Sequence, residues 1–120
     1  MGKILIIQDS HYISKILTFK LKVLGFASET AITGTEGLGK ARTGEYQLIL
    51  LDYTLPDIDG GSICKLLKND PATEKISVLF VSAKDDSELD KITEETNADG
   101  WISMPFEGQD FEKKVSKFAK

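Results

Sequence analysis

Two carboxylates in this sequence follow short apolar runs. Asp52 comes directly after residues 48–51, and Asp9 stands two positions after residues 4–7. If the fold brings the two into one pocket, their repulsion is about 4 kcal/mol at roughly 4 Å in an effective dielectric of about 20. One carboxylate then stays protonated, or a cation lies between them. Oxygen ligands favour a hard divalent ion, which makes Mg²⁺ the expected cofactor.

An in-line phosphoryl acceptor requires the same set of groups. It needs a carboxylate nucleophile, a metal ion that neutralises charge on the equatorial oxygens, and hydrogen-bond donors to the remaining oxygens. Ser82, which follows the apolar residues 78–81, is a candidate for one such donor. These residue types favour phosphoryl acceptance on Asp52.

The elements that would position these side chains are short apolar runs separated by helical patterns. Runs of four to five apolar residues are too short for a helix and are typical of buried strands. Strands are expected at residues 4–7, 26–30, 48–52, 77–81 and 101–103. Helices are expected at residues 11–24, 35–43, 61–68 and 85–96, and after Phe106.

Strand and helix alternate five times without a repeat or a linker, which predicts one domain over residues 1–120. The expected fold is α/β: a doubly wound, flavodoxin-like, five-stranded parallel sheet in the order 2-1-3-4-5 with right-handed crossovers. In that order the carboxyl ends of the first and third strands meet at the switch point, where open sheets bind ligands. Asp9 and Asp52 are therefore expected to be neighbours.

Side-chain patterns also predict how individual helices begin and pack. Ser10 is a good N-cap for the first helix. Gly37 and Gly39 lie within the second helix, and each weakens a helix interior by about 0.5–1 kcal/mol relative to alanine. Leu66 and Leu67 are expected to point inward from the third helix.

The composition narrows the class of protein. The formal net charge is −4, and an acidic chain argues against a nucleic-acid-binding surface, which usually carries a basic footprint. A single cysteine, Cys64, excludes an internal disulfide and fits a reducing compartment. The first apolar run is too short for a signal peptide or a membrane span, so a cytoplasmic location is expected.

Four motifs, taken together and in order, resemble those of the receiver domains of two-component response regulators. They are ILIIQD at residues 4–9, LLDYTLPDIDG at 50–60, VSA at 81–83 and ADGWISMPF at 98–106. The resemblance covers essentially the whole chain. It implies a (βα)5 signalling domain, not a classical enzyme, in which Asp52 accepts a phosphoryl group from a sensor histidine kinase or a phosphotransfer protein.

The resemblance also implies roles for individual residues. Mg²⁺ would be held by Asp9, Asp52, the backbone carbonyl of Thr54 and, through a water, Gln8. The switch residues would be Ser82 and Trp101, and Pro105 would lie in a cis-proline loop.

Two positions depart from the family pattern. Gln8 replaces one of two acidic residues and contributes no negative charge, so the affinity for the metal is expected to fall. Met104 stands where the family carries a lysine that pairs with the acyl phosphate. A hydrogen bond to a charged group contributes about 1.5–3 kcal/mol, and a thioether cannot replace the ammonium.

Two readings stay open from these departures: a phosphorylation-driven switch, and a pseudo-receiver that binds proteins without a phosphorylation trigger. A flavodoxin-type electron carrier would need a Ser/Thr/Gly-rich phosphate cradle after the first strand, and residues 8–12 are not one. An aspartyl phosphatase of the haloacid dehalogenase type would have a second aspartate at position 54, which is Thr54 here.

Charge on the last two expected helices suggests a possible weak homodimer. The fourth helix carries Glu88, Asp90, Glu94 and Glu95, and the last carries Lys113, Lys114, Lys117 and Lys120 late in its length. Complementarity to the helix macrodipole is the favoured explanation of the lysines. The downstream partner is not identified by the sequence, and no membrane or nucleic-acid partner is expected.

Overall fold

A computed structural model describes residues 3–43, 45–106 and 109–119. Five strands alternate with five helices in these residues. In chain order they are β1 (Lys3–Ile7), α1 (His11–Val23), β2 (Ser28–Ala31), α2 (Gly34–Ala41), β3 (Tyr46–Asp52), α3 (Gly60–Lys68), β4 (Ser77–Ser82), α4 (Asp86–Thr96), β5 (Gly100–Ser103) and α5 (Asp110–Ala119). The strands form one parallel sheet in the order β2-β1-β3-β4-β5. This confirms the expected fold class and strand order.

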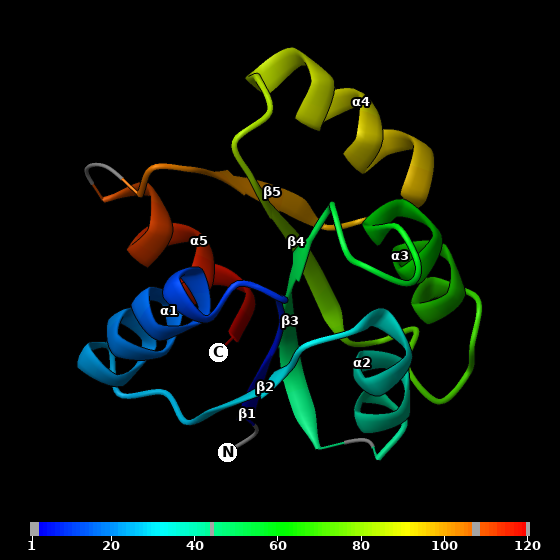
Figure 1. The fold of residues 1–120 in the computed structure, drawn as a ribbon, viewed down its shortest axis with the longest axis horizontal. Coiled ribbons are helices and arrows are strands. Elements are labelled where there is room, and N and C mark those ends of the chain that lie inside the picture. Colours follow the sequence, from blue (N-terminus) through cyan, green and yellow to red (C-terminus); the bar gives the residue numbers. More distant parts are fainter. Residues whose placement is uncertain (1–2, 44, 107–108, 120) are drawn as a thin grey trace.

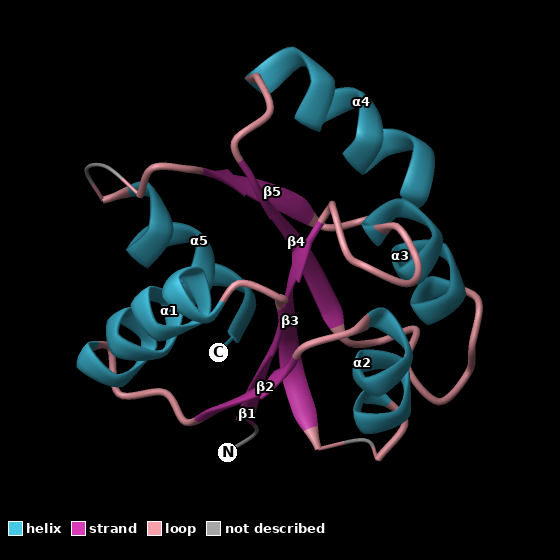
Figure 2. Ribbon diagram, in the orientation of Figure 1, coloured by secondary structure: helices cyan, strands magenta, loops and turns pink. Residues whose placement is uncertain are grey.

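The sheet separates two helical layers, with α1 and α5 on one side and α2, α3 and α4 on the other (Figures 1 and 2). Alternate residues of β3 contact opposite layers. Leu48 and Leu50 pack with the side chains of α1 and α5, whereas Ile49 and Leu51 pack with those of the other layer. A strand covered on both faces needs a continuous apolar run, which is why residues 48–51 contain no polar side chain.

Helix α1 begins as expected, because the Ser10 hydroxyl accepts a hydrogen bond from the Ile13 backbone N–H at 3.3 Å. The prediction for Leu66 was wrong. Its side chain is 48% exposed, and the buried stripe of α3 is instead formed by Ile63, Cys64 and Leu67. Because these residues already fill one helical face, Leu66 falls about 100° away from Leu67 and faces solvent.

Gly37 is required where α2 packs on the sheet. A Cβ at Gly37 would lie 2.5 Å from Cδ1 and 2.8 Å from Cγ1 of Ile7, whereas a Cβ at Gly39 would meet no atom within 4 Å. The two glycines that weaken the helix therefore differ in their packing. Only Gly37 permits the close approach of α2 to β1.

Candidate functional site

Asp52 is the last residue of β3, the central strand. Leu51 pairs with Ile7 of β1, and Asp52 pairs with Val81 of β4, so the ends of both neighbouring strands flank the carboxylate. Helix α3 begins at Gly60, which lies directly against the backbone of Asp52. A Cβ at Gly60 would lie 2.5 Å from the Asp52 carbonyl oxygen, and the Gly60 N–H donates to the Tyr53 carbonyl at 2.7 Å.

The Asp52 carboxyl is half-buried, and its pKa is raised to about 6. Burial is the main cause, because desolvation disfavours the charged form. The negative charge of Asp9 raises the pKa further, while hydrogen bonds from the backbone N–H groups of Thr54 and Tyr53 lower it. The fold thus places Asp9, which is exposed, close enough to act on Asp52.

No salt bridge involves Asp9 or Asp52 in the described part of the chain. The two negative charges therefore share one edge of the sheet without a protein cation paired to either. That arrangement favours a bound metal ion.

Gln8 adds an amide to this edge in place of a third carboxylate. Its side chain is buried, with 2% of the residue exposed. Oε1 accepts a hydrogen bond from the Ser10 backbone N–H at 3.0 Å, and Nε2 is buried without a hydrogen-bond partner. One lone pair of Oε1 is thus already used, and its predicted contact with a metal-bound water would need the other.

The donor set fits Mg²⁺ better than a metal held entirely by protein. Within residues 3–43, 45–106 and 109–119, no group of three or more His, Cys, Asp or Glu side chains could hold a metal ion. Mg²⁺ usually retains several waters and binds through one or two carboxylates, which Asp9 and Asp52 can supply. Thr54 lies in the exposed loop that follows β3, where the resemblance assigns its carbonyl to the same ion.

Ser82 ends β4, the strand beside β3, and is buried. Its Oγ accepts a hydrogen bond from the backbone N–H of Lys84 at 3.1 Å. Because the acceptor function of the hydroxyl is used in this way, its own proton is available to a second acceptor. The carbonyl of Ser82 also accepts a hydrogen bond from the Met104 N–H at 2.8 Å, which joins the ends of β4 and β5.

Trp101 lies on β5, on the side of the sheet covered by α4, and is partly buried. Its Nε1 donates to Oδ1 of Asp90 on α4 at 2.8 Å. The ammonium of Lys114 from α5 lies 4.1 Å from the centroid of the ring. The ring therefore contacts both helices that flank the sheet edge.

Met104 and Pro105 follow β5, and the peptide bond between them is cis. Met104 packs against the core layer that includes α1 and α5. It also lines an open groove of about 520 Å³ beside α1, together with Tyr12, Ile13, Ile16, Lys20, Ala83, Pro105 and Phe106.

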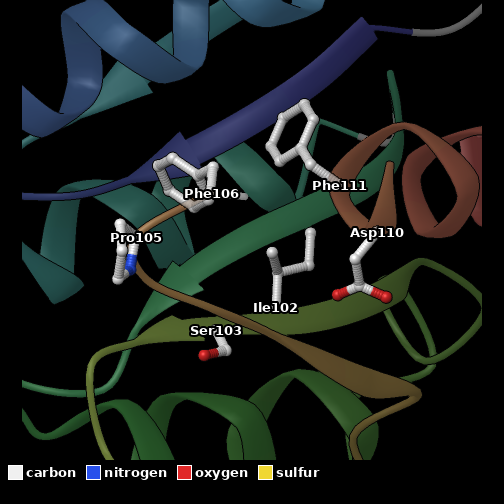
Figure 3. A pocket seen from close by; sticks show the side chains of 6 residues that line it. All are labelled: Ile102, Ser103, Pro105, Phe106, Asp110 and Phe111. Atoms are coloured by element: carbon white, nitrogen blue, oxygen red, sulfur yellow. The ribbon is translucent and has the colours of Figure 1, made fainter. Parts of the chain in front are cut away.

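A second hollow of about 240 Å³ lies between β5 and α5 (Figure 3). Of the predicted site residues it includes only Pro105, and its one carboxylate, Asp110, pairs with Lys114 at 3.3 Å. Neither Asp9 nor Asp52 lines this hollow, so it is separate from the acidic site.

Three further residues shape the site and were not singled out from the sequence. Asp57 accepts hydrogen bonds from the Thr35 hydroxyl at 2.7 Å and from the backbone N–H groups of Thr35 and Gly34 at 2.9 and 2.8 Å. These bonds fix the start of α2 and hold the pKa of Asp57 well below its usual range. Tyr53 packs edge-on against Phe80. Lys84 lies over the Tyr53 ring. For these contacts the sequence offered one indication, Asp57 among the turn-forming residues that follow Asp52.

The chain matches the response regulator receiver domain family over residues 4–116. It belongs to that family. Receiver domains are phosphoacceptor domains of two-component systems and are generally not classical enzymes. The predicted family is therefore confirmed, and so is the class of signalling domain.

Relatives of this receiver domain include longer regulators. The chain is 35% identical over 114 residues to the alkaline phosphatase synthesis transcriptional regulatory protein PhoP of Bacillus subtilis, covering 94% of this chain and 46% of that protein. It is 33% identical over 116 residues to the DNA-binding dual master transcriptional regulator RpaA of Synechocystis sp., covering 96% of this chain and 48% of that protein. The chain thus spans about half the length of these relatives.

A solved structure shares the fold over nearly its whole length. The response regulator TrrA of Thermotoga maritima, in complex with Mg²⁺-BeF, aligns with a TM-score of 0.86 and 25% identity and covers 98% of this chain and 99% of that one. A receiver domain of the same architecture therefore binds Mg²⁺.

Proposed function

We propose that Asp52 accepts a phosphoryl group from the phosphohistidine of a sensor histidine kinase or a phosphotransfer protein, with Mg²⁺ bound by Asp9 and Asp52. A carboxylate oxygen of Asp52 would attack phosphorus as the phosphorus–nitrogen bond breaks, and the histidine nitrogen would leave with the bonding electron pair. The observation that carries the proposal is the half-buried Asp52 carboxyl, beside Asp9 and without a paired protein cation.

The residues around Asp52 support this reaction in distinct ways. The backbone N–H groups of Tyr53 and Thr54 favour the ionised carboxylate that must act as the nucleophile. Gly60 holds the backbone of Asp52 against the start of α3, which limits displacement of the nucleophile. Bound Mg²⁺ would neutralise charge on the oxygens of the transferring group.

Ser82 and Trp101 are proposed to convert phosphorylation into a change of surface. The free proton of the Ser82 hydroxyl can be donated to a phosphoryl oxygen, and the Ser82 carbonyl is bonded to the backbone after β5. Movement of the end of β4 would therefore reach β5, where Trp101 contacts α4 and α5.

The second candidate function is a phosphorylation-independent pseudo-receiver that acts as a protein-interaction module. Met104 favours it, because a thioether offers no positive charge to a phosphoryl group. Gln8 favours it as well, because its side chain brings no charge to the metal and its Oε1 already accepts from Ser10.

The test is phosphorylation by a small acyl phosphate donor in the presence of Mg²⁺, followed by intact-mass spectrometry. We expect the wild-type protein to gain the mass of one phosphoryl group and Asp52→Asn to gain none. Removal of Mg²⁺ with a chelator is expected to suppress labelling of the wild type.

Asp59→Asn is the matched control, since Asp59 is exposed and caps α3 through the Ser62 N–H at 2.9 Å, in the loop that follows Asp52. This variant should be labelled like the wild type. Equal labelling of Asp52→Asn would contradict the assignment of the acceptor, and absence of labelling in every variant would favour the pseudo-receiver.

We propose that residues 1–120 form one receiver domain in the cytoplasm. In the described residues no helix is long and apolar enough to cross a bilayer. The absence of nucleic-acid binding stays a prediction for these 120 residues, because relatives of about twice the length are named as transcriptional regulators, one of them DNA-binding.

A further inference from the structure

Phosphorylation of Asp52 would leave a negatively charged group beside Asp9 and at most one metal ion. A phosphoryl group presents three acceptor oxygens, and binding it firmly calls for cationic donors in addition to the metal. A positively charged side chain near that edge of the sheet would therefore stabilise the phosphoryl group.

The loops at the carboxyl ends of the strands offer one cationic side chain. In the described part of the chain these loops comprise residues 8–10, 32–33, 53–59, 83–85, 104–106 and 109, and Lys84 is the only lysine or arginine among them. Lys84 follows Ser82 by two residues, in the loop that leads from β4 to α4 (Figure 1).

The side chain of Lys84 reaches the ring of Tyr53, in the loop that follows β3. Its ammonium lies 5.3 Å from the centroid of the Tyr53 ring, and Tyr53 is the residue directly after Asp52. The backbone of Lys84 is fixed by its N–H, which donates to the buried hydroxyl of Ser82. A lysine with an anchored backbone and a flexible four-carbon stem can move its charge over several ångströms without moving the loop.

The present partners of the Lys84 ammonium are weak. Its closest carboxylate oxygen is Oε2 of Glu88, one helical turn later, at 3.8 Å. The Lys84 side chain is 35% exposed and that of Glu88 is 55% exposed, and exposed pairs of this kind contribute little. A doubly charged phosphoryl group nearby would compete well against one distant carboxylate.

We propose that Lys84 is the cation that pairs with the phosphoryl group on Asp52 in this protein. On phosphorylation its ammonium leaves Glu88 and the Tyr53 ring and donates to a phosphoryl oxygen. Ser82 and Lys84 would then contact the phosphoryl group from the same loop. The inference rests on the proposed function and adds a residue to it.

Isothermal titration with beryllofluoride in the presence of saturating Mg²⁺ tests the proposal, since this probe binds the carboxylate as a phosphoryl mimic. We expect Lys84→Gln to weaken beryllofluoride binding about fivefold to tenfold, which is less than a fully buried charged hydrogen bond would give, because the side chain is partly exposed. Lys84→Arg should restore most of the affinity.

Two further variants separate a direct contact from a general effect of charge. Lys91→Gln removes the same charge from an exposed position on α4 and should leave the affinity unchanged. Glu88→Gln removes the competing carboxylate and should tighten binding. The affinity for Mg²⁺ alone should be no weaker in Lys84→Gln than in the wild type, which shows that the acidic site is intact.

The outcomes distinguish this inference from the proposed function. Equal beryllofluoride affinity in the wild type and Lys84→Gln overturns the role of Lys84 and leaves Asp52 as acceptor. The same loss in Lys91→Gln as in Lys84→Gln also overturns it. No binding by the wild type overturns the proposed function, and the inference with it.

Discussion

At the scale of single residues, the Asp52 carboxyl opposes folding when it is ionised. Its pKa rises from 3.8 in the unfolded chain to about 6 in the fold. The folded protein therefore binds a proton more tightly than the unfolded chain. The resulting stability is fully present below about pH 4 and is lost as the pH rises through about 6.

Replacement of Asp52 by asparagine removes this dependence. In the absence of Mg²⁺ we expect Asp52→Asn to be more stable than the wild type at pH 7 by about 1–2 kcal/mol, a value reduced from the full shift because the group is only half-buried. The difference should become small near pH 4 and disappear below it, where the Asp52 carboxyl is neutral in the unfolded chain as well as in the fold.

Urea unfolding of the two proteins at pH 4, 5, 6 and 7 measures the difference. A stability gap that stays constant over this range would show that the carboxyl group is not the cause. Asp85→Asn should fail to reproduce the gain, because Asp85 is exposed and its N-cap hydrogen bond to Glu88 lowers the pKa of Asp85.

Some residues of the site could be predicted from the sequence pattern and others could not. Asp9, Asp52 and Ser82 were predictable because each follows an apolar run, and strand order alone brings such residues to one edge. Lys84 gave no comparable signal. Its importance depends on the direction of a flexible side chain over Tyr53, which follows from packing and not from periodicity.

At the scale of elements, α2 combines two glycines with opposite consequences. Gly39 is exposed and an added methyl group would meet no neighbour, so it only weakens the helix. Gly37 allows contact with Ile7 of β1, and its absence would force α2 away from the sheet. Gly39 therefore lowers the stability of α2 without any gain in packing, whereas Gly37 allows α2 to pack closely on β1.

Alanine at each position gives a matched pair of variants. Gly39→Ala should raise the free energy of unfolding by about 0.4–1 kcal/mol, because alanine reduces the freedom of the unfolded chain and suits a helix. Gly37→Ala should lower it by about 1–3 kcal/mol through overpacking against Ile7.

Thermal unfolding followed by circular dichroism provides the comparison. The two midpoints should move in opposite directions relative to the wild type. A rise in both would mean that Ile7 repacks freely and that the close approach at Gly37 is not required.

All ten elements were predictable from apolar runs and helical patterns, but their boundaries and faces were less so. The second strand was expected at residues 26–30 and is found at Ser28–Ala31. This edge strand is mostly half-buried and polar, and its bounds depend on pairing with β1. The orientation of Leu66 was predicted wrongly because apolar character alone does not say which of several apolar residues face the core, and Ile63, Cys64 and Leu67 fill that face here.

At the scale of the whole molecule, charge is divided across the edge strand β5. Helix α4 lies on one side of β5 and α5 on the other (Figure 1). Helix α4 exposes five acidic residues, Asp86, Glu88, Asp90, Glu94 and Glu95, and one basic residue, Lys91, whereas α5 exposes Lys113 and Lys117. A two-fold axis near β5 would place α4 of each copy opposite α5 of the other.

We therefore expect weak, salt-sensitive self-association. Sedimentation velocity at low salt should show a concentration-dependent dimer, and about 1 M salt, where the Debye length is about 3 Å, should dissociate it. Lys117→Glu should abolish the dimer. Lys22→Glu, an exposed charge reversal on α1, should not. A monomer at every concentration and salt level would contradict a dimer through α4 and α5.

The contact of Gly60 with the backbone of Asp52 has a consequence for how the domain deforms. The start of α3 packs against the backbone of Asp52 and Tyr53 so closely that a methyl group at Gly60 would not fit. A bulky adduct on Asp52 cannot be accommodated by retreat in that direction. We therefore expect a group added to Asp52 to displace the neighbouring loop after β4, and with it the segment after β5, whose Met104 N–H donates to the Ser82 carbonyl.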